Sequence, residues 1–68
     1  MVELFSKKGF GFTYLNGRYE EYTSVRAVVY EPETRSIAIL WADGEWVEND
    51  TDVYISIQAL DNGSIIEF

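Results

Sequence analysis

The chain has 68 residues, with five Lys and Arg against twelve Asp and Glu, and its formal net charge is −7. It contains no cysteine and no histidine, which excludes disulfide bonds, thiolate metal sites and catalysis by an imidazole. A chain of this length is expected to form one small domain, residues 1–68, held together by apolar packing alone.

Short apolar runs between turn residues predict an all-β fold of about six short strands. We expect a small antiparallel barrel or a strongly curved sheet, of SH3-like or OB-like form. Residues 2–5 predict the first strand and residues 9–15 the second. The dipeptide Asn16-Gly17 predicts a two-residue type I′ turn, followed by a return strand that begins at Arg18.

The second half of the chain predicts a meander of further strands. Strands are expected at residues 25–30 and 36–41, joined by a turn in which Pro32 sets φ. The chain is then expected to turn at 42–44 into a strand at 45–48, to loop at 49–52, and to end in strands at 53–60 and 64–68 around a turn at 61–63.

The first hairpin carries an aromatic face, and the direction of that face decides its meaning. A two-residue turn pairs Tyr14 with Tyr19, Phe12 with Glu21 and Phe10 with Thr23, with all six side chains on one face. The opposite face of this hairpin carries too few apolar side chains to be the main core face. We therefore expect Phe10, Phe12 and Tyr14 to fill the core, with Glu21 near a rim. A base-stacking platform and a protein-binding aromatic patch are the alternatives.

The stretch from Lys8 through Gly9, Phe10 and Gly11 to Phe12 resembles the second strand of cold-shock domains. That resemblance implies that the two phenylalanines lie on an outer face and stack unpaired bases, each stack contributing about 1–3 kcal/mol. The second aromatic motif of that family, Val-Phe-Val-His-Phe, has no counterpart here.

Residues 27–49 are similar to the KTSC domain, a short module found alone in bacterial and phage proteins and at the end of some lysyl-tRNA synthetases. The matching positions are Ala27, Val28, Tyr30, Pro32, Glu33, Thr34, Ile37, Ile39, Trp41 and Gly44. The Tyr-x-Tyr strand of that family is replaced here by Trp46, Val47 and Glu48. The resemblance implies a role with RNA.

The residue types present do not assemble a reactive constellation. Without histidine or cysteine, catalysis would need tuned carboxylates, lysines or hydroxyls in a pocket. The stretch Glu48 to Asp52 offers carboxylates to a hard cation but lacks the ligand spacing of a dedicated Ca²⁺ loop. We expect no enzyme activity, no cofactor and no metal site.

The leading hypothesis is a non-catalytic acidic interaction module that docks on a larger protein with a basic surface. Aromatic side chains supply interface anchors, and an acidic field speeds encounter with a basic partner. Its size and charge are like those of accessory or phage-encoded regulators and inhibitors, some of which imitate nucleic-acid charge. The expected protein-binding residues are Glu20, Glu21, Glu45, Trp46, Glu48, Asp50 and Asp52.

The alternative hypothesis is a single-stranded RNA- or DNA-binding small β-barrel. Its site would be formed by Lys7, Lys8, Phe10, Phe12, Tyr14 and Arg18, whose three cations are expected to lie close together. A homodimer formed through an edge strand is a third hypothesis. No apolar run approaches the ~18 residues of a membrane span, and the N-terminus lacks a signal-peptide core, so we expect a cytoplasmic protein without a membrane partner.

Overall fold

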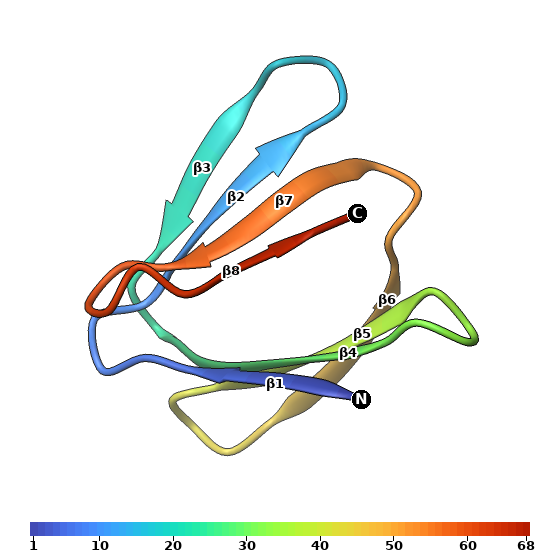
Figure 1. Ribbon diagram of the computed structural model, residues 1–68. Coiled ribbons are helices and arrows are strands. Elements are labelled where there is room, and N and C mark those ends of the chain that lie inside the picture. The colour runs from blue at the N-terminus through green and yellow to red at the C-terminus, as the bar shows by residue number, and fades with distance from the viewer.

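The computed structural model describes all 68 residues and contains eight antiparallel strands and no helix (Figure 1), which confirms the all-β prediction. The strands are β1 (Val2–Phe5), β2 (Phe10–Tyr14), β3 (Tyr19–Tyr22), β4 (Val25–Glu31), β5 (Ser36–Trp41), β6 (Trp46–Asp50), β7 (Tyr54–Ala59) and β8 (Ile65–Glu67).

The strands form two four-stranded sheets that pack as two layers. Sheet I has the order β1-β4-β5-β6, and sheet II has the order β3-β2-β7-β8. In Figure 1 the two sheets come together where β1 leads into β2 and β3 into β4, and they spread apart toward the two chain termini. A closed barrel needs strand pairing all the way around, whereas β1, β6, β3 and β8 are each paired on one side only. The fold is therefore an open two-sheet structure with eight strands, which agrees with the sheet alternative of the prediction rather than with a closed barrel, and it has two strands more than expected.

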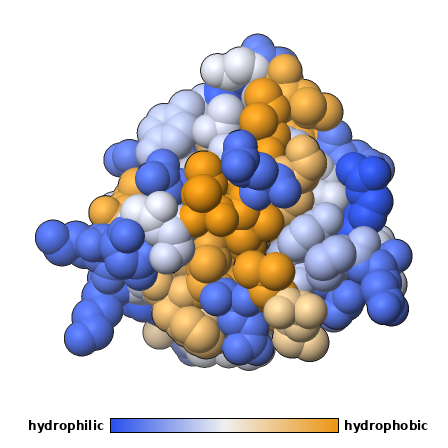
Figure 2. Space-filling view, in the orientation of Figure 1, coloured by the Kyte–Doolittle hydropathy of each residue, from blue (hydrophilic) through white to orange (hydrophobic).

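The core lies between the two sheets and is built from the aromatic face of the first hairpin. Phe10 and Phe12 are 0% and 2% exposed, which confirms that they fill the interior. The buried cluster comprises Phe10, Phe12, Val25, Val28, Ile37, Ile39, Tyr54, Ile57, Ala59 and Ile66. The space-filling view in Figure 2 also shows apolar side chains in a band across the middle of one side, bordered by hydrophilic groups. The two thin layers therefore leave part of the apolar surface uncovered.

The β2–β3 turn lies where Asn16-Gly17 predicts it, but it contains three residues rather than two. The backbone N–H of Tyr14 donates to the carbonyl of Arg18 (2.8 Å), and the N–H of Gly17 donates to the carbonyl of Tyr14 (3.0 Å). Gly17 has φ +88°, as expected for the last residue of a three-residue hairpin loop. The extra residue shifts the register by one, so Phe12 pairs with Glu20 instead of Glu21.

All three Asn-Gly and Asp-Gly dipeptides of the chain form turns with the same local hydrogen bond. In each turn, the side-chain oxygen of the Asn or Asp accepts the backbone N–H of the residue that follows the glycine. The three bonds run from Arg18 to Asn16 (3.0 Å), from Glu45 to Asp43 (2.9 Å) and from Ser64 to Asn62 (2.9 Å). This side-chain bond mimics a backbone turn, which explains why these dipeptides mark hairpin ends in the sequence.

Strand β6 extends further than its sequence suggests. Asn49 and Asp50 were expected to begin a loop, but they pair with Ile37 and Ser36 of β5. The partner strand overrides the low intrinsic β-propensity of Asn and Asp, because propensity in sheets depends strongly on context.

Asp61 ties the β7–β8 turn to the link between β1 and β2. Its Oδ2 accepts the backbone N–H of Lys7 at 2.9 Å, and this bond lowers the pKa of the Asp61 carboxyl below its usual value of about 3.9. A carboxyl whose pKa is lowered by folding stabilises the fold above its unfolded-state pKa. That stabilisation is lost as the pH falls through the folded-state pKa.

Asp61→Asn is therefore expected to lower the urea midpoint at neutral pH, and the difference from wild type should shrink as the pH falls below about 4. Urea denaturation of both proteins across this pH range measures the difference. Asn62→Ala, which removes the bonds of the Asn62 side chain to the carbonyl of Phe5 and to the N–H of Ser64, is a control without a titrating group. A difference for Asp61→Asn that stays constant with pH would show that the carboxylate charge is not involved.

Candidate functional site

The outer face of sheet I carries an apolar row that crosses all four strands. Phe5 of β1 pairs with Ala27 of β4, Ala27 with Leu40 of β5, and Leu40 with Trp46 of β6. Residues paired across a sheet lie on the same face, so these four side chains form one continuous line. We call them the outer row.

The outer row is exposed at its two ends and covered in its middle. Phe5 is 62% exposed and Trp46 is 53% exposed, whereas Leu40 is half-buried. Ala27 is only 1% exposed, although it does not belong to the buried core cluster between the sheets. The row therefore presents two aromatic anchors on the edge strands with a shallow apolar floor between them.

Carboxylates lie directly beside the outer row on the same face. The adjacent row of paired residues on this face consists of Glu3, Val29, Ala38 and Glu48. The row beyond it consists of Glu31, Ser36 and Asp50. The face thus changes from apolar to acidic within two rows. An apolar patch with a polar rim is typical of protein interaction surfaces.

The structure separates the seven residues that the sequence predicts for protein binding. Trp46, Glu48 and Asp50 alternate along β6 and share the outer face of sheet I. Asp52 instead lies in the β6–β7 connection, beside Tyr14 and Leu15 of the β2–β3 hairpin.

Glu20 and Glu21 point to opposite faces of β3. On the inner side, Glu20 accepts a hydrogen bond from the Tyr22 hydroxyl (3.1 Å). On the outer side, Glu21 accepts one from the Tyr19 hydroxyl (2.7 Å). The two carboxylates therefore do not form one acidic patch, although the sequence predicts both of them for protein binding.

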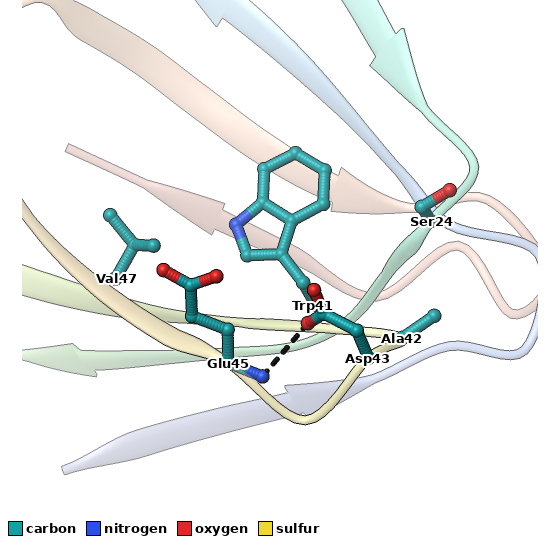
Figure 3. Close-up of a pocket in the computed structure, with 6 residues that line it drawn as sticks. All are labelled: Ser24, Trp41, Ala42, Asp43, Glu45 and Val47. Atoms are coloured by element: carbon teal, nitrogen blue, oxygen red, sulfur yellow. Dashed lines mark hydrogen bonds between the residues drawn. The ribbon is translucent and has the colours of Figure 1, made fainter.

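Glu45 turns away from the outer face and lines a cleft of about 340 Å³ at the β5–β6 turn. Figure 3 shows its carboxylate and the indole of Trp41 facing the same space, with Val47 beyond the carboxylate. Asp43 is fixed beside them, because its Oδ1 accepts the backbone N–H of Glu45. An aromatic ring next to two carboxylates suits a cationic side chain.

The residues of the nucleic-acid alternative do not form a stacking platform. Phe10 and Phe12 are buried, so they have no ring face to offer a base. The bare backbone of Gly11 between them is covered on the outer face by the ring of Tyr19, into which any added Cβ would project.

The three cations of that alternative also lie apart. Lys7 and Lys8 precede β2, and Lys7 is bound at the β7–β8 turn, whereas Arg18 follows the turn at the far end of the hairpin. Arg18 lies 3.7 Å from a carboxylate oxygen of Glu20. The expectation that these cations lie close together is therefore wrong.

Two of the residues that build the outer face were not anticipated from the sequence. Phe5 and Leu40 join Trp46 only through the pairing of β1 with β4, β4 with β5 and β5 with β6. The alternation of Trp46 and Glu48 in the strand predicted at 45–48 was the one local signal for this face, whereas Asp50 was expected in the loop that follows.

Comparisons with protein-family models, with curated proteins and with solved structures return no match. The structure brings no group of three or more acidic side chains together in an arrangement that could hold a metal ion. It also has no long apolar helix of the kind that crosses a lipid bilayer.

Proposed function

We propose that this protein is a non-catalytic cytoplasmic docking module that binds a protein partner with a basic surface through the outer face of sheet I. The outer row carries the proposal, because Phe5 and Trp46 remain more than half exposed in a domain whose other large rings mostly pack inside. Exposed aromatic anchors of this kind commonly dominate binding energy.

The chemistry around the outer row defines the partner. Glu3 and Glu48 lie in the row next to the outer row and Asp50 in the row after it, so a complementary surface has an apolar depression bordered by lysine or arginine. The net charge of −7 adds long-range attraction to such a surface. A regulator or inhibitor that covers a basic site on a larger protein would use this face. If the covered site binds nucleic acid, the module acts by imitating nucleic-acid charge.

The test compares partner binding by wild type with that of a Phe5→Ala/Trp46→Ala double variant. Truncation of a hot-spot aromatic side chain weakens the binding free energy by about 2 kcal/mol or more, so the affinity of the double variant should fall by about 30-fold or more. Proteins captured from a cell extract are identified first, and the affinity of the purified partner is then measured by calorimetry at two salt concentrations.

Leu15→Ala is the matched control, because Leu15 is 64% exposed but lies in the β2–β3 turn of sheet II. This variant should bind like wild type. The proposal is wrong if the partner binds the double variant with unchanged affinity, or if only nucleic acid is captured. Sedimentation of the free protein distinguishes a second copy of the chain from a different partner.

A further inference from the structure

An aromatic cavity lies between the two sheets on the side bounded by the edge strands β3 and β6. Its volume is about 140 Å³, and five rings line it: Phe12, Tyr14, Tyr22, Trp41 and Tyr54. The rings come from β2, β3 and β7 of sheet II and from β5 of sheet I. The cavity is separate from the outer row, because Trp41 faces the interior while Trp46 lies on the outer face of sheet I.

Neighbouring rings around the cavity are inclined to one another, and none of these pairs is stacked in parallel. The Tyr22 ring is at 82° to Phe12 and at 79° to Trp41, with centroid distances of 5.4 and 5.8 Å. The Tyr54 ring is tilted at 50° to Phe12 and at 41° to Tyr14, with centroid distances of 5.7 and 5.2 Å. The rings therefore face the cavity from several directions rather than forming a stack.

The cavity reaches the protein surface. Tyr14, Tyr22 and Trp41 are half-buried, and Asn49 on β6, which also lines the cavity, is exposed. A volume of 140 Å³ holds roughly four water-sized groups at about 30 Å³ each. A trimethylammonium head, with one nitrogen and three methyl groups, is of this size.

The carboxylate of Glu20 stands at the phenol end of one of these rings, that of Tyr22. One oxygen of Glu20 accepts a hydrogen bond from the Tyr22 hydroxyl (3.1 Å), and its other oxygen lies 3.7 Å from the guanidinium of Arg18. Burial, and after it the Glu20 carboxylate, raise the pKa of Tyr14 above its usual value. The rings thus lie next to one carboxylate, and the cation paired with that carboxylate, Arg18, is itself largely exposed.

We propose that this cavity binds a quaternary or methylated ammonium group. Aromatic ring faces attract compact cations, and methylated ammonium groups are the ligands for which aromatic boxes are suited. The Glu20 carboxylate adds attraction for a cation and disfavours an anion. A neutral group of the same shape gains only the apolar contacts. The ammonium group can belong to a free small molecule such as choline or to a methylated lysine of another protein.

The first arm of the test compares choline with its neutral isostere 3,3-dimethylbutan-1-ol, using amide chemical shifts and tryptophan fluorescence of the wild-type protein. Cation–π attraction of about 1 kcal/mol or more predicts that choline binds at least about fivefold tighter than the isostere. Equal affinity for both compounds, or no shift changes at cavity residues, would overturn the proposal. This comparison needs no variant and does not depend on fold stability.

The second arm uses charge-neutralising variants of equal net charge. Glu20→Gln should weaken choline binding, whereas Glu21→Gln, on the opposite face of β3, should leave it unchanged. Glu45→Gln tests the cleft at the β5–β6 turn, which Trp41 also lines. If Glu45→Gln weakens choline binding and Glu20→Gln does not, the cation binds in the cleft and the proposal is wrong.

The third arm distinguishes the two sources of the ligand. A trimethyllysine peptide that binds more tightly than both choline and the unmodified peptide indicates a methylated protein, while affinity equal to that of choline indicates a small molecule. Either result supports the ammonium site. The Phe5→Ala/Trp46→Ala variant should keep this binding, so the ammonium site and the proposed docking face can fail separately.

Discussion

Phe12→Ala is expected to unfold most of the protein at room temperature. Truncation of a buried phenylalanine costs about 3–5 kcal/mol. A single core in so small a domain rarely supplies more than about 3–5 kcal/mol in total. Phe12 is 2% exposed, packs against Tyr22 and Tyr54, and lies between Glu20 and Ile57 in the register of sheet II. Its removal would also enlarge the aromatic cavity that it lines.

Urea denaturation followed by far-UV circular dichroism measures the loss of stability. Leu15→Ala removes an apolar side chain three residues away that is 64% exposed, and it should change the free energy of unfolding by no more than about 0.5 kcal/mol. Phe12→Leu should retain the fold with a lower midpoint. A Phe12→Ala protein with the wild-type midpoint would show that this ring is not part of the core.

The sequence predicts the strands well because most of them are short apolar runs between strong turn residues. The bounds of β1 and β5 agree with the prediction. The register of the first hairpin was missed because Asn16-Gly17 is compatible with both two-residue and three-residue loops. In the observed register the Tyr19 ring covers Gly11, a contact that no local pattern indicates.

The layer arrangement and the outer face depend on contacts between distant strands, which is why the sequence did not reveal them. Phe5 and Trp46 belong to one surface only because β1 and β6 are the two edges of the same sheet. Charge gave little guidance, since all four edge strands carry carboxylates: Glu3 on β1, Glu20 and Glu21 on β3, Glu48 and Asp50 on β6, and Glu67 on β8. Charged edges prevent sheets from pairing with each other. Carboxylates alone therefore do not mark a binding site, and the apolar row beside them distinguishes the outer face of sheet I.

Gly9→Ala is expected to be the most damaging glycine substitution in the chain. Gly9 has φ +98°, a conformation that strains any residue with a Cβ, and it is buried in the link between β1 and β2. An added Cβ would collide with the carbonyl oxygen of Tyr22 and the Cα of Thr23. Both are backbone atoms, so no side-chain rotation can relieve the collision. The carbonyl of Gly9 also accepts the N–H of Leu60 at 3.0 Å, so the link cannot shift away without losing that bond.

Gly17→Ala separates the cost of backbone strain from the cost of the collision. Gly17 has a similar φ of +88°, but no atom lies within 4 Å of an added Cβ. Left-handed strain alone costs about 1–2 kcal/mol, which is the loss of stability expected for Gly17→Ala. For Gly9→Ala, the collision adds about 1–3 kcal/mol, for a total of about 2–5 kcal/mol. Urea denaturation of the two variants measures the difference directly. Equal losses would mean that the strands around Gly9 move apart freely. A larger loss of stability for Gly9→Ala would show that the link between β1 and β2 is rigidly packed.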